Sequence, residues 1–370
     1  MPTLREFTID DLIASLDEWE DFACTISTDL FVGAIGFEDR SSVCFNTWCT
    51  EHQGKTPRAL LINYPFNVRE NKYQAERFDI AASSLGITPT NLLYNRLKIF
   101  GEILAIVRNN PVPKHILLDI SSMASFAFYP VLAGLLEVAP NAELTVCYTE
   151  AVDYFPSLDE WQKFQKQMKD YDLLERARLF DESHFQSKGV DSVYEAVNFP
   201  GRNSGNMPTK LIVIPNFSFE RVNRMIDHAV SRYHCERSDC EWIIGMPPNQ
   251  AKNAWRYDAL WEMYNKPNAK RDASTLHYKE MLLTLHQVWR DHYLSESLVI
   301  ATTGSKAQHL ATFLFLLMHP EVGLVLAEPR EFNASRYSAK AGRQWSLKLG
   351  VVNRFVSNLK QWNRLSFEWD

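Results

Sequence analysis

The segment 31-FVGAIGFEDR-40 decides the fold, because 211-LIVIPNFSFER-221 repeats its pattern later in the chain. Each segment combines a short apolar run, typical of a buried strand, with a loop that ends in an acidic residue and an arginine. The two arginines, Arg40 and Arg221, are 181 residues apart. A strand that recurs together with its loop indicates an internal duplication.

Three further pairs of segments recur in the same order. They are 60-LLINYP-65 and 242-WIIGMP-247, 116-ILLDISSMAS-125 and 298-LVIATTGSKAQ-308, and 144-LTVCYTEAVDYF-155 and 322-VGLVLAEPREF-332. Offsets taken from Pro65 to Pro247, Ser121 to Thr303 and Glu150 to Glu328 are 182, 182 and 178 residues. We therefore predict that residues 26–150 and 210–335 form equivalent units with the same strand order, facing each other across a pseudo-two-fold axis.

The alternation of strand-like and helical segments predicts an α/β fold of two Rossmann-like units with mostly parallel sheets. Neither unit contains a GxGxxG motif. Strands are expected at residues 30–35, 59–63, 115–120 and 144–148, and again at 210–215, 241–245, 298–302 and 323–327.

These elements predict three parts of the chain. Residues 1–155 form the first unit, with an amphipathic helix near Thr8 to Phe22, and residues 156–205 form a helical linker that begins with a capping box at Ser157 and Glu160. Residues 206–370 form the second unit, which carries a helical insertion at 250–296 and ends in a basic amphipathic helix at 346–362.

Composition favours an intracellular, cytoplasmic protein. The chain has 370 residues, a formal net charge of −6 and six cysteines without a CxxC pair, so neither a disulfide framework nor general attraction to nucleic acid is expected. No apolar run approaches a membrane span, and the first residues lack the regions of a signal peptide. Cys44, Cys49 and His52, like His234, Cys235 and Cys240, lack the spacing of structural zinc ligands, and we expect no metal or cofactor.

Two equivalent turns, 119-DISSMAS-125 and 302-TTGSKAQ-308, are the strongest candidate site. In each turn a strand gives way to small hydroxyl residues and then to an apolar helix, whose N-terminus attracts anions. The candidate ligand contacts are Ser121, Ser122, Thr303, Gly304, Ser305 and Lys306. Alternatively, the hydroxyl groups only cap the two helices.

Charged and amide residues at other strand ends extend this candidate site. Arg40 and Arg221 suit a phosphate, although each arginine could instead form an internal ion pair with its acidic neighbour. Asn63 suits a base or sugar contact, and it is also a common turn residue. Asp119 is a further ligand candidate and, with Glu150 and Glu328, could act as an acid or base.

The turns DISSMAS and TTGSKAQ resemble the strand-to-helix turn of CARF domains, which are Rossmann-like sensors of cyclic oligonucleotides in prokaryotic defence. The related SAVED domain is similar to two CARF units fused in one chain. The resemblance implies ligand contacts from both turns, Ser121–Ser122 and Thr303–Lys306. This chain departs from the pattern because its first turn lacks a Gly-Lys pair and no nuclease segment is recognisable.

Taken together, these features predict a protein that binds or senses a nucleotide in antiviral defence, with its effector activity on a partner protein. One alternative is a nucleotide or nucleoside hydrolase or glycosidase. Another is a non-catalytic subunit of a defence complex, which docks nucleic acid or protein through the basic residues between Arg343 and Arg364.

Overall fold

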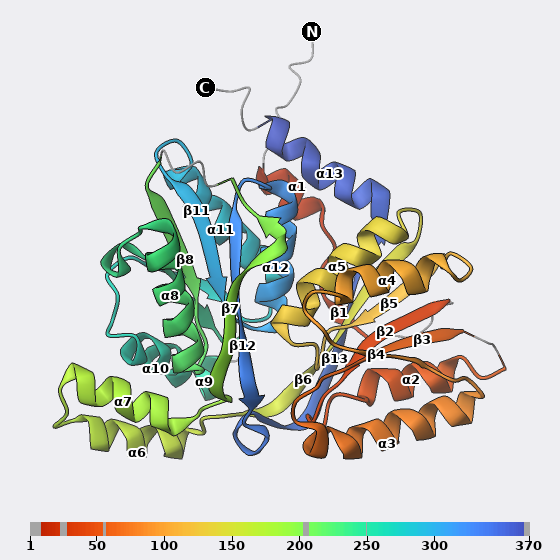
Figure 1. Ribbon diagram of the computed structural model, residues 1–370, viewed down its shortest axis with the longest axis horizontal. Coiled ribbons are helices and arrows are strands. Elements are labelled where there is room, and N and C mark those ends of the chain that lie inside the picture. Colours follow the sequence, from red (N-terminus) through yellow and green to blue (C-terminus); the bar gives the residue numbers. More distant parts are fainter. Residues whose placement is uncertain (1–8, 23–27, 55–56, 203–206, 249, 366–370) are drawn as a thin grey trace, which may run out of the picture.

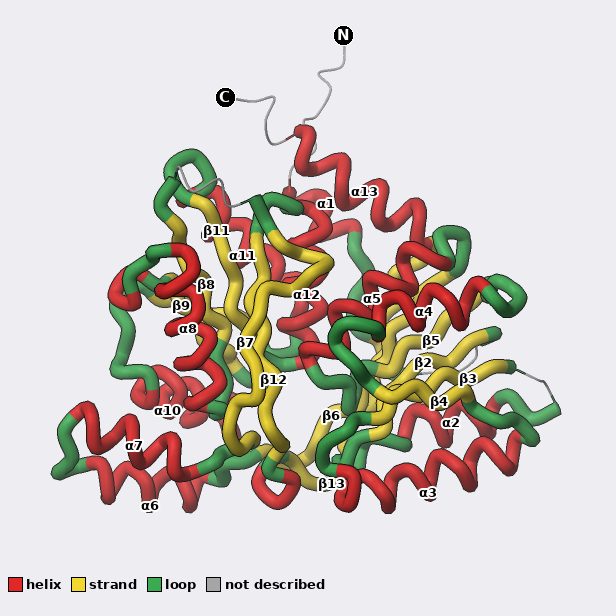
Figure 2. Tube along the Cα trace, viewed as in Figure 1, coloured by secondary structure: helices red, strands yellow, loops and turns green. Residues whose placement is uncertain are grey.

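The computed structural model describes residues 9–22, 28–54, 57–202, 207–248 and 250–365. Two sheets stand side by side in it, with helices between them and on their outer faces (Figures 1 and 2). The strand order is β1-β13-β6-β5-β2-β3-β4 in the first sheet and β10-β9-β8-β11-β12-β7 in the second.

The two sheets are built from equivalent elements. The first unit contains β2 (Leu30–Ile35), α2 (Val43–Glu51), β3 (Arg58–Asn63), α3 (Val68–Leu85), β4 (Thr90–Leu93), α4 (Ile99–Arg108), β5 (His115–Asp119), α5 (Ser125–Val138) and β6 (Glu143–Tyr154). The second contains β8 (Thr209–Ile214), α8 (Phe219–Tyr233), β9 (Glu241–Met246), α9 (Gln250–Asn253), α10 (Trp255–Met263), β10 (Lys270–Ser274), α11 (Tyr278–His292), β11 (Ser297–Thr302), α12 (Lys306–Met318) and β12 (Gly323–Phe332).

The parallel part of each sheet follows the same order, β4-β3-β2-β5-β6 in one unit and β10-β9-β8-β11-β12 in the other. The predicted fold class is therefore confirmed, and so is the predicted equality of strand order. All eight predicted strands are present, whereas β4 and β10 carry too few apolar residues to have been recognised.

In each sheet, the antiparallel strand next to the last parallel strand follows the other unit in the chain. β7 (Ser187–Pro200) follows the first unit but pairs antiparallel with β12, and β13 (Ser338–Val351) follows the second unit but pairs antiparallel with β6. The chain thus crosses between the sheets twice, at the lower centre of Figure 1. Each half therefore completes the sheet of the other.

The predicted linker and closing helix need correction. Residues 158–183 form two helices, α6 (Leu158–Met168) and α7 (Leu173–Ser183), because a second capping box at Asp172 and Glu175 starts a new helix. The box at Ser157 is confirmed, but residues 187–200 of the predicted linker form strand β7. The closing helix is α13 (Val352–Leu365), since Leu347 and Leu349 follow the two-residue period of β13.

Two other predicted helical segments are shorter than expected. The N-terminal helix is α1 (Ile9–Ser15), followed by strand β1 (Glu20–Asp21); its proposed cap, Thr8, lies outside the described residues. The insertion at 250–296 holds helices but also strand β10. Short 3-10 turns, η1 (Arg237–Asp239) and η2 (Ala334–Arg336), complete the described elements.

The hydrophobic core between the sheets belongs to both units. Helices α4 and α5 cover the inner face of the first sheet, α11 and α12 that of the second, and their apolar side chains form one cluster. The equivalent helices α5 and α12 meet through Phe128 and Phe313, with ring centroids 5.9 Å apart. Separate clusters lie under α2 and α3 on one outer face and under α6, α7, α8 and α10 on the other. This packing brings the strand-to-helix turns before α5 and α12 together at the centre.

None of the helices in the described part of the chain combines the length and apolarity that a membrane span requires.

Candidate functional site

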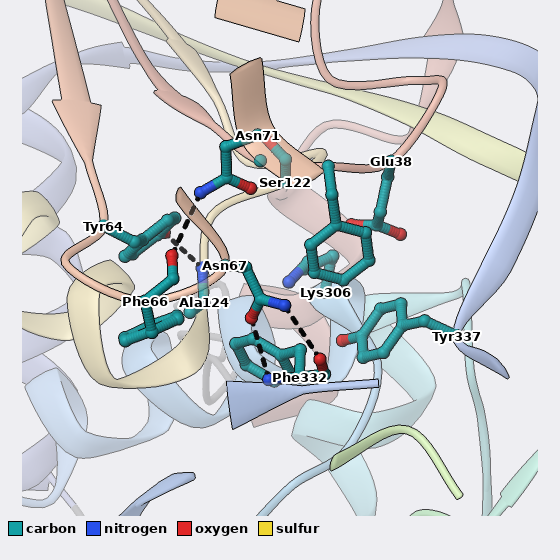
Figure 3. Close-up of a pocket in the computed structure, with 12 residues that line it drawn as sticks. Glu38, Tyr64, Phe66, Asn67, Asn71, Ser122, Ala124, Lys306, Phe332 and Tyr337 are labelled. Carbon is teal, nitrogen blue, oxygen red and sulfur yellow. Dashed lines mark hydrogen bonds between the residues drawn. The ribbon is translucent and has the colours of Figure 1, made fainter. Parts of the chain in front are cut away.

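A pocket lies where the two units meet at the carboxyl ends of their strands (Figure 3). Its cavity volume is small, about 20 Å³. Loops after β2, β3 and β5 supply most of its lining, α12 supplies one lysine, and the crossover from β12 to β13 supplies two aromatic rings. The lining residues are Gly36, Phe37, Glu38, Tyr64, Phe66, Asn67, Asn71, Ser122, Ala124, Lys306, Phe332 and Tyr337.

Lys306 reaches across from the second unit. It is the first residue of α12, and its ammonium group donates a hydrogen bond of 2.5 Å to the carbonyl oxygen of Met123 in the first unit. Burial lowers the pKa of Lys306 to about 8; Glu38 and Asp119 oppose this shift, while Arg40 and Arg221 favour it. The lysine therefore joins the two candidate turns directly.

The two equivalent arginines are both buried but differ in their partners. Arg40 contacts the carbonyl oxygen of Thr149 on β6, and Arg221 makes the equivalent contact with Ala327 on β12. Arg40 also forms an ion pair with Glu38 at 2.7 Å, which confirms the internal-pair alternative for this residue. In the described part of the chain Arg221 has no such pair, and its Nε atom has no hydrogen-bond partner.

Charged groups of both signs lie at the pocket and next to it. Lys306 and Glu38 line the pocket, while Arg40, Arg221, Asp119 and Glu328 lie nearby without lining it. Burial would by itself lower the pKa of Arg40, but Glu38 and nearby tyrosines raise it well above its usual value, so this side chain stays charged. Burial also lowers the pKa of Arg221 and raises that of Asp119 to about 6. Because a buried charge without an ion-pair partner is costly, Arg221 and the neighbouring Lys306 favour an anionic group.

Aromatic rings form the walls of the pocket. Tyr64 and Phe66 are stacked with centroids 5.2 Å apart, and Phe332 packs edge-on against Phe66 at 5.7 Å. Phe37 and Tyr337 meet edge-on at 5.5 Å on the other side. Such walls favour a planar aromatic group through stacking.

Two asparagines at the start of α3 add polar contacts. Asn67 donates to the carbonyl oxygen of Phe332 and accepts from its amide, both at 2.9 Å, and so fastens the crossover to the first unit (Figure 3). Asn71 donates to the carbonyl oxygen of Phe66 at 3.2 Å, and among the described residues its Oδ1 atom has no hydrogen-bond partner, although the residue is only 7% exposed. The pocket wall therefore contains a buried acceptor to which a ligand could donate a hydrogen bond.

The first predicted turn contributes one hydroxyl to the pocket. Ser121 is fully buried, donates to Asp119 at 2.5 Å and accepts from the amide of Thr149, so its hydroxyl is used inside the protein. Ser122 lines the pocket and donates to the carbonyl oxygen of Ala34. Neither serine caps α5, whose N-cap is Ala124, so the capping alternative is wrong for this turn.

In the second turn, capping is confirmed for Ser305. Its side chain accepts from the amide of Gln308 and completes a capping box. A Cβ atom on Gly304 would lie 2.6 Å from Gln308, so this position suits glycine. Thr303 is 3% exposed, and its hydroxyl has no hydrogen-bond partner. Of the four candidates here, Lys306 alone lines the pocket.

The remaining candidates surround the pocket without lining it. Asn63 donates to Asn91 on β4 at 2.9 Å, and Asp119 lies beneath the pocket at 3% exposure. Glu328 accepts from Tyr94, and Trp345 and Arg343 face Glu150 on the edge of the first sheet. None of these carboxylates is part of the lining.

Sequence reasoning missed several lining residues, namely Gly36, Phe66, Asn71, Ala124, Phe332 and Tyr337. An apolar or aromatic residue next to a strand looks the same in a sequence whether it fills the core or a pocket. Phe332 and Tyr337 also lie about 270–300 residues from Phe37 and Phe66 in the chain, and only the strand exchange places them opposite one another. The sequence contains one indication of Phe332, because this residue ends the recurring segment 322–332 that also contains Glu328.

Comparisons with known proteins identify no family. No family model matches the chain, and no curated protein is significantly similar to it. Similar solved structures include a functionally unknown protein from Pseudomonas aeruginosa PAO1, with 10% identity and a TM-score of 0.24 over 92% of this chain and 98% of that one. A putative universal stress protein from Pseudomonas aeruginosa UCBPP-PA14 has 10% identity and a TM-score of 0.24 over 91% and 98% of the chains. These values are too low to support a functional argument.

Proposed function

We propose that the protein binds a nucleotide in the pocket between its two units and acts as a sensor of that ligand. The observation that carries this proposal is one cavity that combines aromatic walls with the ammonium group of Lys306, close to a buried arginine, Arg221, that forms no ion pair among the described residues. A nucleotide has the two matching parts, a planar base and an anionic phosphate. The base would stack between the rings near Phe66 and Phe332, and the phosphate would approach Lys306.

The pocket is narrow as the structure shows it, since its cavity volume of about 20 Å³ is room for about one water molecule. A nucleotide base would therefore enter only if the aromatic side chains around Phe66 and Phe332 move apart. The ligand would be a mononucleotide or one unit of a larger cyclic oligonucleotide whose other parts extend toward solvent. Because both units line the pocket, binding would affect their contact with each other.

We further propose that the ligand is a second messenger of prokaryotic antiviral defence and that a partner protein carries the effector activity. Support comes from the resemblance of the turns at 119–125 and 302–308 to CARF and SAVED domains. The duplicated α/β architecture is consistent with that resemblance.

The alternatives receive less support from the site. The pocket carboxylate, Glu38, is paired with Arg40 and accepts from Ser338, which does not favour a role as a general acid or base. Nucleic-acid binding by the basic residues between Arg343 and Arg364 is disfavoured because two of them, Arg343 and Lys348, each face a carboxylate, namely Asp21 and Glu20. The side chain of Arg364 lies outside the described part of the structure.

Two measurements test the proposal. Mass spectrometry of the freshly purified protein should identify a bound nucleotide, and calorimetric titration with mono-, cyclic di- and cyclic trinucleotides should find at least one ligand. Binding should be roughly tenfold to a hundredfold weaker in Lys306→Met and unchanged in Lys252→Met, because Lys252 is exposed outside the pocket. Absence of any bound nucleotide and of any titration signal would contradict the proposal.

A further inference from the structure

A second polar cluster lies beneath the pocket, inside the first unit. Asp119 is the last residue of β5, and Cys147 is its direct partner in register on β6. Cys44, on α2, packs against this pair from the outer face of the sheet. Three residues from distant parts of the chain therefore converge, a pattern that no local cysteine spacing reveals.

The geometry of this cluster is that of a set of metal ligands. The sulfur atoms of Cys44 and Cys147 are 2.7 Å apart, and both lie within 4.8 Å of a carboxylate oxygen of Asp119. All three residues are buried, at 1%, 1% and 3% exposure. The sulfur atoms are closer than the roughly 3.5 Å contact of two non-bonded carbon atoms. A bridging ion would hold such a pair together without that crowding.

Neighbouring groups support this arrangement. The amide and hydroxyl of Ser121 both donate to Oδ1 of Asp119, at 2.9 and 2.5 Å, and orient the carboxylate as outer partners of metal ligands do. Thr149 lies two residues after Cys147 on the same face of β6, and its fully buried hydroxyl has no hydrogen-bond partner among the described residues. A water molecule would supply the fourth position of a tetrahedral site.

We propose that Cys44, Cys147 and Asp119 bind one Zn²⁺ ion, which fastens α2 to the sheet beneath the pocket. Two thiols and a carboxylate are a ligand set that favours zinc over magnesium or calcium. Loading releases two thiol protons for each Zn²⁺ bound, so the net charge of the buried cluster does not change. Zinc–sulfur bonds of about 2.3 Å hold two sulfurs roughly 3.8 Å apart, so the pair must separate by about 1 Å.

Elemental analysis of the intact protein tests this site. Protein expressed with zinc in the medium should contain about one Zn²⁺ per chain, and Cys147→Ser should contain less than a tenth of that amount. Cys49→Ser is the matched control, because Cys49 is equally buried on α2 but lies outside the cluster. It should keep its zinc. Cells grown with Co²⁺ in place of zinc should yield protein with thiolate-to-cobalt charge-transfer absorption, a readout on the unaltered chain.

Three results would overturn the inference. One is wild-type protein that lacks zinc and shows no cobalt absorption. Another is equal zinc in the wild type and in Cys147→Ser. The third is a disulfide between Cys44 and Cys147, which differential alkylation and mass spectrometry would detect. If Cys147→Ser fails to fold, the cobalt spectrum of the unaltered chain decides the question.

Discussion

At the scale of single residues, Lys306 links the two halves of the site most directly. The sequence identified it by its position after a recurring strand, and the structure places its ammonium group against the carbonyl of Met123 in the other unit. Its environment could not be predicted from the turn alone, because Glu38, Arg40 and Arg221 come from distant segments. A lysine expected at the surface of a helix is in fact partly buried among other charges.

Replacing Lys306 by methionine should therefore affect binding and stability differently. Loss of a charge-assisted contact should weaken nucleotide binding by roughly tenfold to a hundredfold, equivalent to about 1.5–3 kcal/mol. Removal of a poorly solvated charge should leave the free energy of unfolding unchanged or raise it by about 1–3 kcal/mol. Calorimetric titration and denaturant unfolding of Lys306→Met measure both effects. Weaker binding together with a lower free energy of unfolding would instead indicate a structural role.

Nucleotide affinity should fall as the pH rises through about 8. Lys306, whose pKa burial lowers to about 8, loses its charge in this range, while Glu38, Arg40, Arg221 and Asp119 are the charged groups that face it. The bound phosphate favours the protonated lysine, so the dissociation constant should increase by up to about tenfold per pH unit above 8. Titrations between pH 6.5 and 9.5 measure this change. A flat profile that matches that of Lys306→Met would show that the lysine does not contact the ligand.

In the ligand-free protein the same lysine predicts the opposite trend for stability. Its pKa is lower in the folded than in the unfolded chain, so between pH 8 and about 10.5 the unfolded chain binds more protons. The contribution of Lys306 to the free energy of unfolding therefore rises with pH in that window. Comparison of wild type and Lys306→Met isolates this contribution.

Arg40 and Arg221 occupy equivalent positions but should respond differently to replacement by methionine. Arg40→Met leaves the buried Glu38 without its partner and should lower the free energy of unfolding by about 3–5 kcal/mol. Arg221→Met removes a buried cation that has no carboxylate partner in the described structure, so its cost should be much smaller. Denaturant unfolding of both variants measures the difference. Equal losses of unfolding free energy in the two variants would contradict the conclusion that Arg40 has an ion-pair partner and Arg221 does not. The placement of the phosphate near the second unit depends on that difference.

At the scale of elements, the sequence predicted the eight central strands and the turns that follow them. It missed the exchanged strands β7 and β13, because the partners of an antiparallel strand cannot be read from local spacing. In β13 the apolar residues Leu347 and Val351 extend a helical spacing that continues through Phe355 and Leu359. The candidate site could not be predicted completely for the same reason, since two of its five aromatic lining residues lie at the crossover between β12 and β13.

The exchange predicts that a change in β13 should weaken the first sheet, although β13 follows the second unit in the chain. Leu347 is fully buried and pairs with Val146 on β6. Leu347→Ala should lower the free energy of unfolding by about 2–5 kcal/mol. Hydrogen exchange should then accelerate in β6 more than in β12. Faster hydrogen exchange in β12 than in β6 would show that β13 stabilises the second unit rather than the first sheet.

At the scale of the whole molecule, the duplication creates the site. Equivalent helices α5 and α12 pack together between two sheets of the same strand order, which brings the carboxyl ends of both sheets to one place. The halves have diverged there: the first supplies most of the aromatic wall and a paired arginine, and the second supplies Lys306 and an unpaired arginine. The ligand is therefore expected to lie asymmetrically across the pseudo-two-fold axis.

A crystal structure of the protein with the tightest-binding nucleotide tests this account most directly. We predict that the base lies among Phe66, Phe332 and Tyr337 and that a phosphate oxygen lies within hydrogen-bonding distance of the Lys306 ammonium group. A second hollow, along α8 and β9, is lined by Phe219, Trp242 and Tyr264 and lies entirely within the second unit. A nucleotide bound in that hollow, with the central pocket unchanged, would contradict the claim that the two halves form one ligand site.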